Sequence, residues 1–96
     1  MIIAVDYDGT LFANEKPNRP LIDRMRREQQ RGSTIILWTC REGKTLAEAL
    51  RTLRSCGLVP NFVNRNSPEA IRYLGHDTRK VLADVYIDDK NARGYV

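Results

Sequence analysis

The stretch Ile2–Thr10, which reads IIAVDYDGT, decides the fold of this chain. Its first four residues are apolar and mostly β-branched, a composition that predicts a short buried strand. Asp6 and Asp8 follow directly, and Gly9 suits a backbone turn after the strand. Because parallel sheets bind their ligands just beyond the carboxyl ends of the strands, this acidic turn is the first candidate site.

The remaining sequence alternates between helix-like and strand-like segments. Apolar runs at 34–38, 62–63 and 81–87 predict three further strands. Helical spacing of apolar residues predicts three helices, over about 20–31, 45–56 and 67–74. Thr45 and Glu48 have the spacing of a capping box, so we expect the second helix to begin there.

This order of elements, β-α-β-α-β-α-β, predicts an α/β fold. Strands that are apolar throughout belong to a parallel sheet that helices cover on both faces, and right-handed crossovers then give a three-layer, Rossmann-like sandwich. With 96 residues the chain has room for one domain, 1–96, around a mostly parallel sheet of four strands. The segment 11–18 is too short for more than a turn or flap, so we expect no cap domain.

Composition narrows the class of protein further. Hydrophobic residues make up 42% of the chain and charged residues 29%, proportions typical of a globular domain rather than a disordered one. No apolar run approaches the ~20 residues of a membrane span, and the N-terminus lacks the basic region of a secretory signal. Cys40 and Cys56 have neither zinc-ligand nor disulfide-framework spacing. We therefore expect a cytoplasmic protein.

Acidic side chains gather where the predicted strands end. Asp6 and Asp8 follow the first strand, and Asp88 and Asp89 follow the last. Thr39 ends the second strand, and Lys80 lies just before the fourth. Four carboxylates, one hydroxyl and several cations are therefore candidates for a single crevice.

Such a crevice requires a cation. Two like charges about 4 Å apart repel by on the order of 4 kcal/mol at an effective dielectric constant near 20. Oxygen ligands without histidine or cysteine favour Mg²⁺, completed by water and a substrate phosphate. Gly9 and Thr10 allow backbone N–H groups to point at an anion, and Thr39 and Lys80 suit the remaining phosphoryl oxygens. Metal, phosphate cradle and free carboxylate together predict phosphoryl transfer, in which a carboxylate can serve as nucleophile.

The segment Ile3–Leu11 resembles the hhhDxDGT(L/V) signature of the haloacid dehalogenase (HAD) superfamily of phosphohydrolases. Thr39 resembles the second motif of that family, and Lys80 and the pair Asp88-Asp89 look like the third and fourth. The motifs span nearly the whole chain in the family's order. The sequence is also similar to small capless HAD proteins of bacteria and their phages.

The resemblance implies a role for each motif residue. Asp6 would attack phosphorus, and Asp8 would protonate the leaving group and then deprotonate the hydrolytic water. Asp6, Asp8 and Asp88 would hold Mg²⁺, Asp8 through its backbone carbonyl, with Asp89 assisting. Thr39 and Lys80 would bind the phosphoryl group.

A second, shorter likeness suggests the kind of substrate. The stretches 39–45 and 77–80 look similar to segments in the phosphatase half of polynucleotide kinase-phosphatases, which favours Lys80 as the phosphate-binding cation. Arg41 is a candidate substrate-binding residue. Net charge is +4, and basic residues concentrate between Arg19 and Arg31. We therefore expect a phosphoester partner, either a nucleotide or the 3′-phosphate of a nucleic acid, the absence of a cap favouring a large substrate.

Two other functions compete with a phosphatase. A receiver-like phospho-acceptor also places acidic residues, a threonine and a lysine around Mg²⁺, but in another motif order. A catalytically degenerate phosphate- or metal-binding module would keep the fold without turnover. The chain ends seven residues after Asp89, where HAD proteins continue, so a second copy in a homo-oligomer could supply the missing cover.

Overall fold

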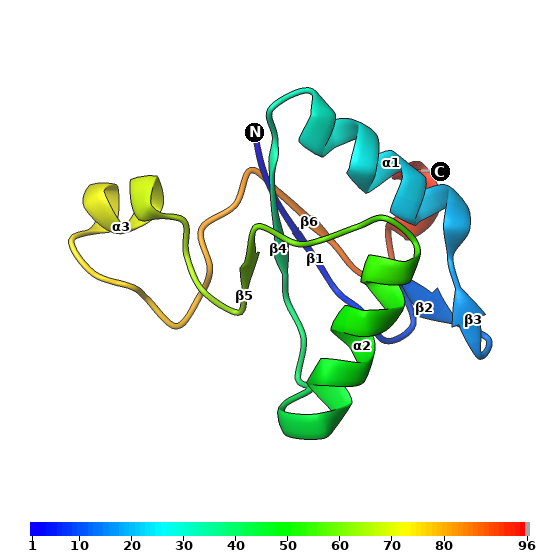
Figure 1. Ribbon diagram of the computed structural model, residues 1–96. Helices are drawn as coiled ribbons and strands as arrows, with labels where there is room; N and C mark the ends of the chain where they lie inside the picture. Colours follow the sequence, from blue (N-terminus) through cyan, green and yellow to red (C-terminus); the bar gives the residue numbers. More distant parts are fainter. Residues whose placement is uncertain (96) are drawn as a thin grey trace.

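The computed structural model describes residues 1–95 (Figure 1). Four parallel strands form the central sheet in the order β5-β4-β1-β6, with bounds β1 Ile2–Val5, β4 Thr34–Leu37, β5 Phe62–Val63 and β6 Val85–Ile87. A small antiparallel hairpin pairs β2 (Phe12–Ala13) with β3 (Lys16–Pro17). The helices are α1 (Arg19–Gln30), α2 (Gly43–Ser55), α3 (Pro68–Leu74) and a final 3₁₀ turn, η1 (Ala92–Tyr95).

The fold is the expected three-layer, Rossmann-like α/β arrangement. In the described residues only the β2–β3 hairpin stands between β1 and α1, so they contain no cap domain. None of the helices in residues 1–95 has the length and apolar character that a membrane crossing requires.

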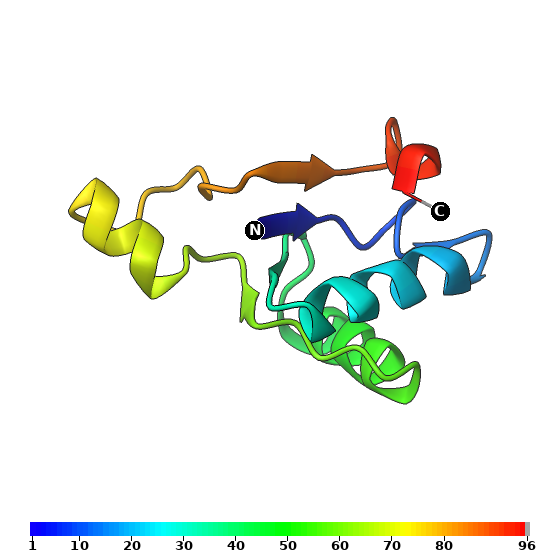
Figure 2. The same ribbon diagram turned by 90° about the horizontal axis from the view of Figure 1, so that it is seen from above.

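One face of the sheet carries most of the hydrophobic core. Ile3 and Val5 of β1 point to this face and pack with buried side chains of α1 and α2, among them Leu21 and Leu53. Both helices lie on the same side of the sheet (Figure 2). The helical spacing of apolar residues that predicted α1 and α2 therefore corresponds to the buried stripes of these two helices.

The opposite face is thinly covered. Ala4 and Ile36 point to this face and form a small cluster with Val81. α3 connects β5 to β6 but stands apart from the other two helices and to the side of the sheet in both views (Figures 1 and 2). Part of this face is therefore left open to solvent.

Two predicted boundaries differ from the structure. α2 begins at Gly43, two residues before the expected capping box, and the Thr45 hydroxyl instead donates to the Glu42 carbonyl, 2.9 Å away. β6 begins at Val85 rather than at position 81. The reason is that the Asp84 carboxylate accepts the Ile2 N–H at 2.7 Å, which ends the strand pairing at this edge.

The strand order fixes where a ligand would bind. From β1 the chain builds outward to β4 and β5, and then returns across the sheet to place β6 on the other side of β1. The winding direction reverses between β1 and β6. In open α/β sheets this reversal opens a crevice beyond the carboxyl ends of the two strands.

Candidate active site

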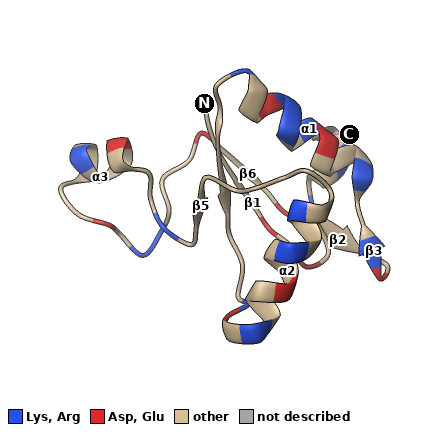
Figure 3. Cartoon of the chain, viewed as in Figure 1, with Lys and Arg blue, Asp and Glu red and all other residues tan. Residues whose placement is uncertain are grey.

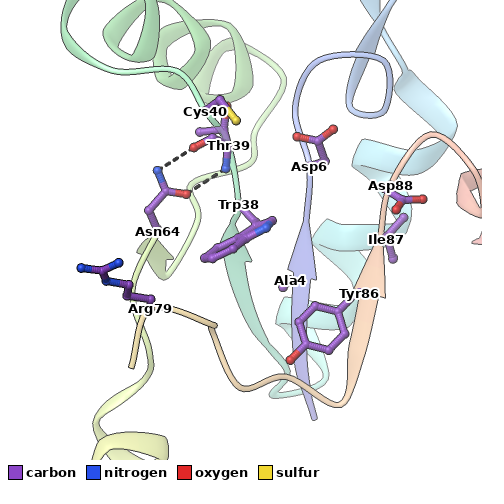
Figure 4. A pocket seen from close by; sticks show the side chains of 10 residues that line it. All are labelled: Ala4, Asp6, Trp38, Thr39, Cys40, Asn64, Arg79, Tyr86, Ile87 and Asp88. Atoms are coloured by element: carbon purple, nitrogen blue, oxygen red, sulfur yellow. Dashed lines mark hydrogen bonds between the residues drawn. The ribbon is translucent and has the colours of Figure 1, made fainter. Parts of the chain in front are cut away.

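A cavity of about 590 Å³ opens at this point of the sheet and extends down its thinly covered face (Figure 4). Asp6 follows β1 directly and Asp88 follows β6, so the end of each strand places one carboxylate at the cavity. Its lining is Ala4, Asp6, Trp38, Thr39, Cys40, Asn64, Arg79, Tyr86, Ile87 and Asp88. The volume is in the range of small-molecule sites.

The surroundings of Asp6 disfavour the negative charge of its carboxylate. Partial burial raises the pKa of its carboxyl group, and the nearby charges of Asp8, Asp89 and Asp88 raise it further. A hydrogen bond from the Tyr7 backbone N–H opposes both effects. Asp8, Asp88 and Asp89 are therefore close enough to Asp6 to disfavour its charged form.

Asp8 has the opposite environment because Arg41 holds it. The Arg41 guanidinium donates two hydrogen bonds to the Asp8 carboxylate, at 2.9 and 2.8 Å, and this pair lowers the pKa of Asp8. Arg41 also donates to the Thr45 carbonyl and lies over the Tyr7 ring, 4.9 Å from its centroid. The candidate substrate-binding arginine is thus engaged with the candidate acid–base residue.

The turn after β1 does not form the phosphate cradle that the sequence suggested. The Gly9 N–H donates to the Phe12 carbonyl and the Thr10 N–H to the Tyr7 carbonyl. The Thr10 side chain is buried, and its hydroxyl has no hydrogen-bond partner. Gly9 and Thr10 therefore shape the loop rather than contact a phosphoryl group, and the expected role of their N–H groups is corrected.

Gly9 has a separate reason to be glycine. Its φ is +77°, which other residues rarely adopt. A Cβ at this position would be in ordinary van der Waals contact with the Asp89 Cβ, 3.6 Å away. The loop after β1 therefore passes close to the turn after β6. This approach brings Asp89 near the other carboxylates although it does not line the cavity.

The turn after β6 is organised by Asp88 itself. Its carboxylate accepts the Lys90 N–H at 2.9 Å, and its own N–H donates to the Asn91 side chain at 2.8 Å. Asp88 remains exposed. One of its carboxylate oxygens is engaged in the turn, which leaves the other for a ligand.

β4 ends at Leu37, one residue before the predicted end, and Thr39 follows two residues later and lines the cavity. Its hydroxyl accepts the Arg41 N–H at 3.1 Å. Its backbone is clamped by Asn64, whose side chain accepts the Thr39 N–H and donates to the Thr39 carbonyl, each at 2.8 Å (Figure 4). Asn64, which the sequence analysis did not single out, therefore positions Thr39.

Of the two neighbouring cations, Arg79 and not Lys80 lines the cavity. Lys80 is exposed beside it. The buried Asn66 fixes this segment, because its side chain donates to the Asp77 carboxylate at 2.8 Å and accepts the Leu82 N–H at 2.6 Å. The assignment of Lys80 to the phosphoryl group stays a prediction, and Arg79 is a second candidate.

The donor chemistry at the cavity fits Mg²⁺. Asp6 and Asp88 at the cavity, and Asp89 near it, offer only oxygen ligands, and a divalent cation would relieve the repulsion that helps to raise the pKa of Asp6. Within residues 1–95 no group of three or more histidine, cysteine or acidic side chains is arranged to hold a metal ion. Mg²⁺ generally takes one or two carboxylates and completes its shell with water and phosphate.

Comparison with solved structures identifies a relative. A conserved protein from Bacteroides thetaiotaomicron is 36% identical, with a TM-score of 0.77, over all of this chain and 80% of its own. The chain therefore belongs to the same family as that protein. No family model matches the sequence. No curated protein matches it either.

Two aromatic residues at the cavity were also missed by the sequence analysis. Trp38 follows the apolar run of β4 and Tyr86 lies within β6, so both were read as ordinary strand residues. For Tyr86 the signal that could have found it is strand alternation, because Tyr86 lies two residues before Asp88. Trp38 directly precedes Thr39, so alternation gives no such signal for it.

Proposed function

We propose that this protein is a Mg²⁺-dependent phosphomonoester hydrolase of the HAD type that works through an aspartyl-phosphate. The single observation that supports this most is the placement of Asp6 and Asp88. They stand after neighbouring parallel strands at the reversal of the winding, in one cavity, with Asp8 and Asp89 close enough to raise the pKa of Asp6. The HAD-like order of the sequence motifs supports the same reaction.

In the proposed reaction Asp6 is the nucleophile. One of its oxygens attacks phosphorus, the bond from phosphorus to the leaving-group oxygen breaks, and that oxygen takes a proton from Asp8. Water then attacks the phosphorus of the aspartyl-phosphate and gives a proton to Asp8. This step breaks the bond between phosphorus and the Asp6 oxygen and releases inorganic phosphate. Asp6, Asp88 and the backbone carbonyl of Asp8 would hold Mg²⁺, with Asp89 assisting, and the ion when bound would neutralise charge on the phosphoryl oxygens.

Arg41 has to leave Asp8 during this cycle. A carboxylate with two charge-assisted hydrogen bonds and a lowered pKa is a poor proton donor. A phosphate dianion offers the guanidinium a competing bidentate partner. We therefore expect substrate to draw Arg41 away from Asp8 and so free Asp8 to take up and give the proton.

Phosphate release from a substrate panel tests the proposal. Nucleotides, sugar phosphates and 3′-phosphorylated oligonucleotides would be offered with and without Mg²⁺. The wild-type protein should release phosphate only with Mg²⁺, and Asp6→Asn should lose all turnover. Asp23→Asn is the matched control, because Asp23 lies on α1, where it pairs with Arg26. Full activity in Asp6→Asn would refute the assignment.

A phosphate-binding module without turnover is the second candidate. It is favoured by the Arg41–Asp8 pair, which in this state occupies the acid–base residue. Mg²⁺-dependent binding of phosphate esters with no release from any member of the panel would select this function over hydrolysis.

A further inference from the structure

The cavity has a second half that phosphate chemistry leaves unused. Asp6, Asp88 and Thr39 lie at its polar end, beyond the strand ends (Figure 4). Trp38 and Tyr86 line the other half, along the open face of the sheet. Both are large aromatic residues, with 38% and 42% of their surfaces exposed. Apolar and aromatic side chains that line a cavity together with a few polar groups are the usual composition of a ligand site.

The sheet holds the two aromatic side chains on either side of a small residue. Ala4 of β1 is the register partner of Tyr86 on one side and of Ile36, two residues before Trp38, on the other. With strands about 4.8 Å apart, β4 and β6 are separated by about 9.5 Å across β1. Ala4 is itself buried against Ile36 and Val81, and it lines the same cavity as Trp38 and Tyr86.

The two aromatic residues are held differently. The Tyr86 hydroxyl donates to the Val81 carbonyl and accepts the Ala83 N–H at 3.1 Å, so this ring is fixed by the segment that crosses the open face. Within residues 1–95 no side-chain hydrogen bond holds the Trp38 ring, and its backbone N–H donates to the Val5 carbonyl at 2.8 Å. Tyr86 is thus fixed by hydrogen bonds of its side chain, whereas the Trp38 ring is held by packing.

We propose that the substrate is a nucleotide, with its phosphate at Asp6 and its base against Trp38 and Tyr86. This inference rests on the proposed function for the phosphate end and on the aromatic half of the cavity for the base. Tyr86 precedes Asp88 by two residues, a step of about 6.6 Å along the strand. That interval calls for a spacer between phosphate and ring, as a ribose provides.

Charge at the cavity agrees with a nucleotide. Arg79 lines the same cavity. An arginine can pair with a second phosphate or stack on a base. Stacking of a base on an aromatic side chain contributes about 1–3 kcal/mol, and this contribution depends little on which base is stacked. The site would therefore select a nucleobase without selecting which one.

The single tryptophan makes the proposal directly measurable. Trp38 is the only tryptophan in the chain, so intrinsic fluorescence reports on this ring alone. Asp6→Asn protein with Mg²⁺ would be titrated with adenosine 5′-monophosphate, ribose 5-phosphate and a 3′-phosphorylated oligonucleotide. The mononucleotide should quench Trp38 saturably, and ribose 5-phosphate should bind more weakly and leave the fluorescence unchanged.

Variants separate stacking from phosphate binding. By calorimetry, Trp38→Ala should weaken binding of adenosine 5′-monophosphate roughly 5- to 150-fold, the equivalent of one stacked base, and leave ribose 5-phosphate unaffected. Trp38→Phe should restore much of the affinity. Tyr73→Ala is the matched control, since Tyr73 is exposed on α3 and does not line the cavity; it should bind as the parent does.

The outcomes distinguish the two proposals. Quenching by nucleotides without phosphate release by the wild-type protein would support the base site and overturn the hydrolase. Release from sugar phosphates as efficient as from nucleotides, with no effect of Trp38→Ala, would overturn the base site alone. A change of Trp38 emission with protein concentration in the absence of ligand would also overturn it, because a second copy would then cover the ring. Tighter, strongly salt-dependent binding of the oligonucleotide would identify a strand end rather than a free nucleotide.

Discussion

The two faces of the sheet are built from alternate residues of the same strands, and they differ in almost every property. Ile3 and Val5 of β1 face α1 and α2 and lie in a closed apolar core. Ala4 and Asp6, their neighbours in sequence, face a cavity that is open to solvent. Because side chains alternate along a strand, Ile3 and Val5 contribute to the core while Ala4 and Asp6, between and after them, line the cavity.

The difference between the two faces predicts where substitutions should lower the stability of the fold and where they should weaken ligand binding. A side chain on the helical face is surrounded by packed neighbours, so its loss creates a cavity. The aromatic side chains at the cavity on the open face, Trp38 and Tyr86, are partly exposed to solvent, so their loss should remove a binding contact and less packing. Each prediction below tests one part of this division.

The largest expected effect is on the helical face. Leu53→Ala, at a fully buried position of α2, should lower the free energy of unfolding by about 2–5 kcal/mol, whereas Trp38→Ala should lower it by about 1 kcal/mol or less. Urea denaturation of both variants and the parent measures the difference. Equal losses would mean that the open face is covered in solution.

Much of this division could be predicted from the sequence. The apolar runs gave β1, β4 and β5, and Ser67 and Gly75 bound α3 as expected, the first by accepting the Ala70 N–H and the second in a left-handed conformation. The start of α2 was missed because no side chain caps it. Local cap patterns fail where tertiary packing sets a helix boundary.

The site was predictable in its residue types and less so in its contacts. Asp6, Asp88 and Thr39 line one cavity because the strand ends that carry them are neighbours, which strand order alone dictates. The Arg41–Asp8 pair joins residues 33 positions apart, and the presence of Arg79 rather than Lys80 in the cavity lining depends on a loop held by a buried asparagine. Such long-range polar contacts have no periodic signature in a sequence.

Mg²⁺ should stabilise the open face and leave the helical face unaffected. At one hundred times its dissociation constant the ion adds about 2.7 kcal/mol to the free energy of unfolding. For a domain of this size the melting temperature should rise by on the order of 10 °C. Asp88→Asn should remove most of this shift in a thermal melt, and Asp23→Asn on α1 should keep it. A melt indifferent to millimolar Mg²⁺ would contradict a shared carboxylate site.

A smaller effect concerns Asp6 without metal. Because its folded-state pKa is raised, Asp6 stabilises the fold fully only below the ordinary carboxyl pKa of 3.8, and this contribution is lost as pH rises through the folded-state value. Asp6→Asn should therefore melt higher than the wild-type protein at pH 7 in chelator. The difference should vanish near pH 3. A lower melting temperature for Asp6→Asn at neutral pH would mean that the carboxylate is stabilised in the fold.

The smallest expected effect is at Arg41. Its pair with Asp8 is bidentate, but 57% of the Asp8 side chain is exposed, so water and salt screen the attraction. Because the pKa of Asp8 is lowered, the pair stabilises the fold above the ordinary carboxyl pKa, and the contribution is lost as pH falls through the folded-state value. Arg41→Ala should thus cost about 0–1 kcal/mol at pH 7 and nothing in strong acid. An NMR titration of the Asp8 carboxyl carbon should show its pKa rising toward the ordinary value in Arg41→Ala. Arg51→Ala on α2, a helix that carries several basic residues (Figure 3), should leave it unchanged. An Asp8 pKa that ignores the loss of Arg41 would mean that the pair does not persist in solution, and Asp8 would then be free to act as acid and base without any exchange of partners.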